Sequence, residues 1–233
     1  MESLALALTM ITSGDPYLWE IITLSLRVSL TALLLATLLG LPLGAVLAAV
    51  PFRGRAVLIG VINTMMGLPP VVVGLFVYML ISNSGPLGVL QLLYTPTAMI
   101  IAQLILIMPI VAALSRQTLE LLAREYDQQF TLFGLSTLAR IKALIVDGRF
   151  ELATVVLAGF GRATAEVGAV IIVGGNIDHY TRVLTTAITL ETSRGNLAAA
   201  MALGIVLLTI SLLINLLVVV VRRWGEGKFG YVD

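Results

Sequence analysis

Five long apolar stretches limit what this chain can fold into more than any other feature. The last of them, residues 197–221, contains no charged residue, and a helix of that length exceeds the ~30 Å hydrocarbon core of a bilayer. The other four cover residues 21–50, 56–81, 96–114 and 152–174. With 59% hydrophobic and 12% charged residues, the chain lacks the polar surface of a cytosolic domain and the charge of a disordered one. We therefore expect an all-α integral membrane protein of about five transmembrane helices, with residues 1–233 forming a single domain.

The basic residues are distributed unevenly between the segments that connect these stretches. If successive stretches alternate in direction, most of the 14 Lys and Arg residues fall on one side of the membrane. Arg182 and Arg194 fall on the other side, and Arg27 and Arg162 lie inside spans. Because basic residues gather on the cytoplasmic side, we expect the N-terminus outside and the C-terminus in the cytoplasm. A sixth span would have to come from residues 1–12.

The one sizeable segment outside the membrane covers residues 115–151, on the cytoplasmic side. Apolar residues recur at helical spacing over residues 115–130, which predicts a helix. A turn follows, and a second short amphipathic helix is expected over residues 137–146. In the first helix Glu120 and Arg124 are four residues apart, so their charges can pair on its exposed face.

The chain lacks the residue patterns of the common enzyme classes. It has no cysteine and one histidine, His179, so no metal site is expected, and it has no G-x-x-x-x-G-K-[ST] loop for ATP. No catalytic Ser/His/Asp set or pair of carboxylates can be recognised. The chain also has no stripe of basic residues of the kind that binds nucleic acid. We expect neither catalysis nor a cofactor on this chain.

Its few polar groups make it a poor pore alone. A homodimer with close-packed helices, as at the Gly-rich residues 39–44, would provide a central interface.

Residues 128–147 resemble the coupling loop of ABC-importer permeases. That loop opens with E-A-A, has a glycine after three more residues, and closes with I-x-L-P after another nine. Here Gly134 is the glycine, and the closing positions are residues 144–147, with Asp147 in place of the proline. The opening positions hold Gln128-Gln129-Phe130 instead of E-A-A.

Other stretches are similar to the permeases of the molybdate, tungstate and sulfate group, so that the resemblance covers nearly the whole chain. These stretches are residues 67–74, 84–88, 161–169, 173–177 and 181–188. Residues 94–98, the five spans and the outside N-terminus are most similar to tungstate permeases.

The resemblance implies the permease subunit of an ATP-driven oxyanion importer in the cytoplasmic (inner) membrane. Tungstate is the expected cargo, with molybdate or sulfate as alternatives. The partners implied are a second copy of the chain, two copies of an ABC ATPase subunit that hydrolyses the ATP, and an extracytoplasmic oxyanion-binding protein. A function of another class, as an ATP-independent carrier or channel, would require transport by this chain alone, and a membrane scaffold would require no transport.

The resemblance also assigns the contact with the ATPase to the turn between the two cytoplasmic helices. The residues concerned are Gln128, Gln129, Thr131, Leu132, Phe133, Gly134, Leu135 and Ser136. The alternative is an ordinary turn between helices, with Phe133 and Leu135 packed into the core.

Four residues inside the spans are candidates for the translocation pathway or its gate. Arg162 and Glu166 are four residues apart, so along one helix they face the same way. They act either at the gate or the dimer interface, or as a structural salt bridge. Pro69 and Pro70 remove two backbone donors and are expected to kink or break the second span. The break either exposes helix N-terminal amides that favour an anion or is a fixed structural kink.

The expected outside loop supplies a fifth pathway candidate, Asn176. Together with His179, Arg182 and Arg194 it could attract an anion or contact the binding protein, and the alternative is a solvated loop. Arg27 lies near the outer end of the first span, where we expect its side chain to reach the membrane interface.

Overall fold

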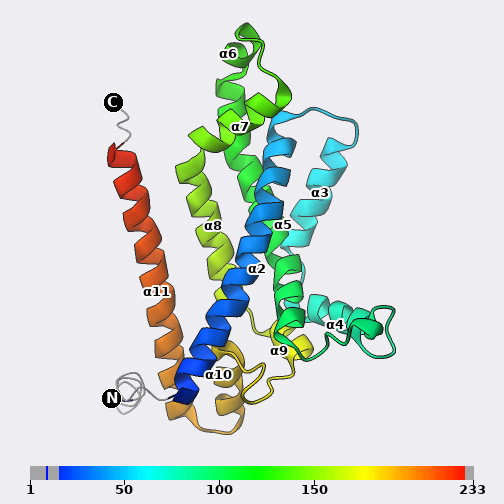
Figure 1. Ribbon diagram of the computed structural model, residues 1–233, viewed down its shortest axis with the longest axis vertical. Helices are drawn as coiled ribbons and strands as arrows, with labels where there is room; N and C mark the ends of the chain where they lie inside the picture. Colours follow the sequence, from blue (N-terminus) through cyan, green and yellow to red (C-terminus); the bar gives the residue numbers. More distant parts are fainter. Residues whose placement is uncertain (1–8, 10–15, 229–233) are drawn as a thin grey trace. The chain divides into compact units, whose positions relative to one another are not determined.

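The computed structural model describes Thr9 and residues 16–228, with side chains up to residue 220. Within these residues the chain is all-helical, without a strand (Figure 1). The helices are α2 (Pro16–Ala49), α3 (Arg55–Met66), α4 (Pro70–Ile81), the 3-10 helix η1 (Gly88–Leu90), α5 (Pro96–Glu125), α6 (Asp127–Leu132), α7 (Thr137–Asp147), α8 (Arg149–Thr164), α9 (Gly168–Gly174), α10 (Leu184–Ser193) and α11 (Leu197–Lys228).

Three helices are long and apolar enough to cross a membrane by themselves: α2, α5 and α11 over Leu197–Val220. Two bent pairs, α3 with α4 and α8 with α9, pass the same test, and the number rises to five if each pair is one broken span. The five predicted stretches fall on these elements. The possible sixth span at residues 1–12 lies, apart from residue 9, outside the described residues.

The second predicted span is broken where its double proline lies. α3 ends at Met66 and α4 begins at Pro70, because neither Pro69 nor Pro70 has an N–H to continue a helical ladder. The carbonyl of Pro69 instead accepts the amides of Val72 (3.0 Å) and Val73 (3.2 Å), which starts α4.

Two other predicted elements differ from the structure. The fourth span was expected to be continuous, but α8 ends at Thr164 and α9 begins at Gly168, so Glu166 lies in a break and not on a helix. The cytoplasmic helix expected over residues 115–130 is the end of α5, which runs to Glu125, followed by the separate helix α6. The second helix expected on the cytoplasmic side corresponds to α7, and its bounds agree with the prediction within one residue.

The chain forms two compact units. One contains Met1–Ala32, Pro69–Leu104 and Gly161–Asn215, and the other contains Leu33–Leu68, Ile105–Phe160 and Leu216–Asp233. Helices α2, α5, α8 and α11 each contribute residues to both units, so neither unit is a continuous piece of chain.

In the second unit, two glycines of the predicted Gly-rich stretch allow α2 and α5 to approach closely. A Cβ added at Gly40 would lie 2.9 Å from the backbone oxygen of Met108, and one at Gly44 would lie 2.6 Å from that of Ala112. These helices therefore meet backbone against backbone, the geometry that small residues permit between membrane helices.

In the first unit, the halves that follow the two breaks pack on each other. A Cβ added at Gly74 of α4 would lie 2.7 Å from the Cα of Ala169 in α9, and the two helices lie side by side in Figure 1. A separate cluster of buried apolar residues joins α2, α10 and α11 in this unit: Leu18, Ile21, Ile22, Leu184, Ala187, Leu203 and Val206.

Candidate functional site

The turn after α6 ends that helix in a Schellman motif. Gly134 has φ +60°, the left-handed conformation that glycine adopts without a Cβ penalty. Around it the amide of Leu135 donates to the carbonyl of Phe130 (3.0 Å), and the amide of Gly134 donates to that of Thr131 (3.2 Å). These two bonds are the pair that defines the motif. Ser136 then begins α7 as its N-cap, accepting the amide of Ala139 at 3.4 Å.

One arginine ties α6, the turn and α7 together. The Nε of Arg140 in α7 donates to the carbonyl of Leu135 in the turn (3.1 Å), and its guanidinium lies 5.8 Å from the ring centroid of Phe130. A further contact joins Arg140 to Asp127 at the start of α6 (3.9 Å). Phe130 is buried and meets the ring of Tyr126 edge-on, with centroids 5.7 Å apart.

Two large apolar side chains of this turn are exposed to solvent. Leu132 is 84% exposed and Phe133 is 77% exposed, whereas Leu135 is only half-buried. The alternative, in which Phe133 packs into the core, does not agree with this exposure. The polar candidates Gln128, Gln129, Thr131 and Ser136 are exposed around them.

A third exposed residue at this tip, Leu138, was missed by the sequence analysis. Helical spacing places Leu138 on one face with Ile141 and Ile145, three and seven residues further on, and that pattern is typical of a core face. Both isoleucines are half-buried, but Leu138 lies in the first turn of α7, beside the exposed tip. We call Leu132, Phe133 and Leu138 the apolar tip.

In the same unit, Glu120 of α5 forms ion pairs with three arginines. The predicted pair with Arg124 is confirmed at 3.1 Å. Arg116, on the same helix, also pairs with Glu120, and Arg55 at the start of α3 lies 3.5 Å from it. The cluster therefore joins the end of α5 to α3 within this unit.

In the first unit, Arg162 and Glu166 do meet. Their Nη2 and Oε2 atoms lie 3.3 Å apart, although Glu166 lies in the break between α8 and α9. Its side chain is 3% exposed, and its second oxygen accepts the amide of Ala169 at 3.0 Å. A carboxylate in this position compensates the free amides at the start of α9. The pair thus has a structural role at the break, and a role in gating stays a prediction.

The two breaks lie against each other. A Cβ added at Gly168 would lie 2.9 Å from Cγ2 and 3.4 Å from the backbone nitrogen of Val71. Gly168 begins α9, and Val71 follows Pro69 and Pro70 at the start of α4. The structure therefore brings the proline break close to the break that contains Glu166.

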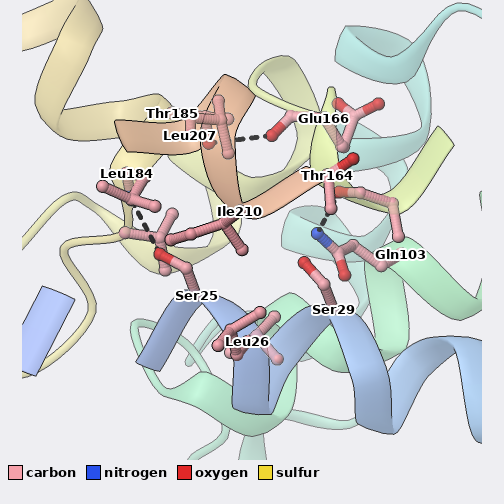
Figure 2. A pocket seen from close by; sticks show the side chains of 13 residues that line it. Ser25, Leu26, Ser29, Gln103, Thr164, Glu166, Leu184, Thr185, Leu207 and Ile210 are labelled. Carbon is pink, nitrogen blue, oxygen red and sulfur yellow. Dashed lines mark hydrogen bonds between the residues drawn. The ribbon is translucent and has the colours of Figure 1, made fainter. Parts of the chain in front are cut away.

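A small cavity, lined by both polar and apolar side chains, lies beside this point (Figure 2). Its volume of ≈ 20 Å³ is room for about one water molecule. Polar side chains reach it from α2, α5, α8 and α10 and from the break between α8 and α9: Ser25, Ser29, Gln103, Thr164, Glu166 and Thr185. Thr185 donates to the carbonyl of Glu166 at 3.0 Å, so α10 is attached to the same break.

Gln103 is the polar residue of the third span that the sequence analysis missed. Its Nε2 donates to the carbonyl of Ala163 at 3.2 Å, while its buried Oε1 has no hydrogen-bond partner among the described residues. A lone glutamine within residues 96–114 was the available signal, because a polar side chain inside an apolar span needs a partner.

The loop after α9 is held by hydrogen bonds rather than freely solvated. Asn176 has φ +50° and its side-chain amide donates to the carbonyl of Thr186 at 3.4 Å. Arg182 donates to Asp178 (2.7 Å) and to the hydroxyl of Tyr17 in α2 (2.5 Å). Hydrogen bonding from Tyr17 lowers the pKa of Asp178 below its usual value. Arg182 is therefore engaged in holding this loop to α2.

The single histidine pairs with a carboxylate of α2. Nδ1 of His179 lies 2.8 Å from Glu20, and this hydrogen bond raises the pKa of His179 above its usual value. Arg194, in the next connection, pairs with Glu191 at 3.1 Å. Among the described residues no three His, Cys, Asp or Glu side chains gather as metal ligands would.

Comparison with known proteins identifies the family of the chain. The family described as "Binding-protein-dependent transport system inner membrane component" matches residues 40–228. The chain is 42% identical over 221 residues to a "Probable anion ABC transporter permease protein" of Haloferax volcanii, covering 92% of this chain and 94% of the relative. It is 42% identical over 214 residues, with the same coverage, to the "Tungstate uptake system permease protein TupB" of Peptoclostridium acidaminophilum. A more distant relative, 27% identical over 91% of this chain and 83% of its own length, is the "Sulfate transport system permease protein CysT" of Salmonella typhimurium.

Proposed function

Because the chain belongs to the family of binding-protein-dependent transport system inner membrane components, we propose that this multi-pass inner-membrane permease serves an ABC importer whose cargo is tungstate. The observation that carries the proposal is the 42% identity, over 92% of the chain, to a permease named for tungstate uptake. The equally similar anion permease agrees with an anionic cargo. Molybdate and sulfate are the alternatives, and the sulfate permeases are more distant.

We further propose that the apolar tip is where the chain contacts an ATPase subunit. Leu132 and Phe133 are exposed on a turn that Arg140 and Gly134 hold in one conformation. Large apolar side chains presented on a rigid support are typical anchors of protein interfaces. A rigid segment of this kind can transmit a displacement of the ATPase to the helices α5 and α8 that flank it.

The remaining parts of the proposal concern assembly. The working unit is a homodimer of single transmembrane domains, each with residues 115–151 as its coupling segment, with two ATPase subunits and an extracytoplasmic binding protein. The breaks that contain Pro69, Pro70 and Glu166 lie on the pathway, close to Arg162. A cation beside a carboxylate attracts an oxyanion weakly, which suits a pathway that must release its cargo.

The experiment is reconstitution of the permease with its ATPase and the binding protein in liposomes. ATP hydrolysis is measured while the binding protein is loaded with tungstate, molybdate or sulfate. We expect tungstate to stimulate hydrolysis at concentrations about tenfold or more below those needed for sulfate, a difference of about 1.4 kcal/mol in binding. Stimulation by sulfate without stimulation by tungstate would contradict the cargo. Anion uptake into liposomes that contain this chain alone would contradict the importer.

A further inference from the structure

A groove of ≈ 390 Å³ lies along the first turns of α2, in the unit that contains the loop after α9. It is lined by one face of α2 and by two residues of that loop: Pro16, Trp19, Glu20, Thr23, Leu24, Arg27, His179 and Tyr180. The transport function proposed above uses none of these side chains.

The length of the charge-free part of α2 indicates that Arg27 lies at the level of the lipid headgroups. Residues 28–49 of α2 contain no charged side chain, and this part of the helix is about 33 Å long at 1.5 Å per residue. The hydrocarbon core is ~30 Å thick. When this charge-free part spans the core, the guanidinium of Arg27 lies at its boundary, next to the phosphates.

Arg27 has no ionic partner among the described residues. The residue is exposed, and it takes part in none of the ion pairs formed among the described residues. The carboxylate that shares the groove, Glu20, is engaged by His179 at 2.8 Å. Asp178, next along the loop, is engaged by Arg182. An arginine at a membrane boundary without a protein counter-charge needs an anion from elsewhere.

The rest of the groove matches a lipid rather than a soluble anion. Trp19 and Tyr180 are both about half exposed, and these two residue types are enriched at the headgroup level of membrane proteins. Thr23, one turn from Arg27, adds an exposed hydroxyl to the same face. Leu30, the next turn in the other direction, is exposed and offers an apolar surface to an acyl chain.

We propose that this groove binds the headgroup phosphate of an anionic glycerophospholipid. Arg27 pairs with the phosphate, Trp19 and Tyr180 flank the glycerol region, and the acyl chains continue along α2 past Leu30. A net negative headgroup is favoured over a zwitterionic one because Arg27 is a cation of the groove without an ionic partner among the described residues. The site requires only that α2 spans the membrane, so its failure would leave the proposed transport function unaffected.

The test uses the full-length chain, purified in mild detergent with the subunits that accompany it. After delipidation, phosphatidylglycerol or phosphatidylcholine is added in graded amounts, and bound lipid is counted by native mass spectrometry. The wild-type protein should bind one phosphatidylglycerol per chain about tenfold more tightly than phosphatidylcholine, as expected for one charge-assisted contact. Equal binding of the two lipids would overturn the proposal without any variant.

Two substitutions locate the site. Arg27→Gln should abolish the preference for phosphatidylglycerol, while Arg27→Lys should keep most of it because the charge remains. Arg194→Gln is the matched control, since it removes an arginine that is already paired with Glu191, and it should leave the preference unchanged. A preference that survives Arg27→Gln, or is lost equally in Arg194→Gln, would contradict the site.

Other occupants give different results. Inorganic phosphate at millimolar concentration should not displace phosphatidylglycerol, because it lacks the acyl chains; displacement would identify a soluble-anion site and overturn the lipid. If a second copy of the chain covered the groove, the Tyr180→Cys variant would cross-link to that copy and lipid would not bind there. That outcome would also overturn the proposal.

Discussion

At the scale of residues, Arg162 at the end of α8 and Glu166 in the break that follows differ in their exposure to solvent. Glu166 is buried, with 3% of its side chain exposed, whereas 32% of that of Arg162 reaches the surface. Arg162→Gln therefore leaves a buried carboxylate without its cation, and we expect it to reduce the free energy of unfolding by about 3 kcal/mol. Glu166→Gln leaves an arginine that can reach the surface, so its cost should be smaller, about 1 kcal/mol. Thermal unfolding of the purified variants measures both.

The double variant separates a structural pair from a gate. If the pair is structural, Arg162→Gln with Glu166→Gln should recover part of the stability lost in the worse single variant, because no buried charge is left alone. If instead both single variants unfold like the wild type but no longer transport, the pair acts in the transport cycle. The structural account of the break would then be wrong.

At the scale of elements, the apolar tip predicts how the segment α6–α7 binds its partner. Phe133→Ala removes a ring that is 77% exposed, so the fold should be unaffected while the affinity for the ATPase falls about tenfold. Leu121→Ala is the matched control, because Leu121 of α5 is 71% exposed and lies outside the tip. Titration of the ATPase against each purified permease gives the two affinities. Equal loss in both variants would show that the tip has no special role.

The elements also show what could be predicted from sequence and what could not. The break at Pro69 and Pro70 was predictable because proline lacks the backbone donor. The break at Glu166 was not, since no residue there is incompatible with a helix. The contacts that accompany it are of two kinds: the Glu166 side chain accepts the amide of Ala169, three residues further on, and Thr185 of α10, distant in the sequence, donates to the carbonyl of Glu166.

The site shows the same division between local and tertiary causes. Gly134 and Ser136 were recognisable because turn chemistry is local, and the structure shows a positive φ at one and an N-cap at the other. Leu138 was not recognisable, since its spacing is that of a core residue, whereas the structure leaves it exposed in the first turn of α7. Gln103 belongs to the same class, because its partner Ala163 is distant in the sequence.

At the scale of the whole molecule, the open question is whether each bent pair crosses the membrane or returns to the same side. Five crossings place η1 outside and the apolar tip in the cytoplasm, whereas three crossings reverse both assignments. The first arrangement keeps Arg124 and Arg140 in the cytoplasm, and the second moves them outside, against the usual distribution of basic residues. We therefore expect five crossings with the N-terminus outside.

The absence of cysteine from the sequence makes a direct test possible, since the wild type has no background for thiol labelling. Val89→Cys in η1, a position that is 94% exposed, should react with a membrane-impermeant maleimide in intact cells, because five crossings place it outside. Phe133→Cys should react only in inside-out vesicles. Tyr180→Cys is the internal control, because both arrangements place it outside.

If Phe133→Cys reacted in intact cells and Val89→Cys did not, the bent pairs would be re-entrant loops. The apolar tip could then not reach an ATPase in the cytoplasm, and the coupling proposal would fail together with the topology.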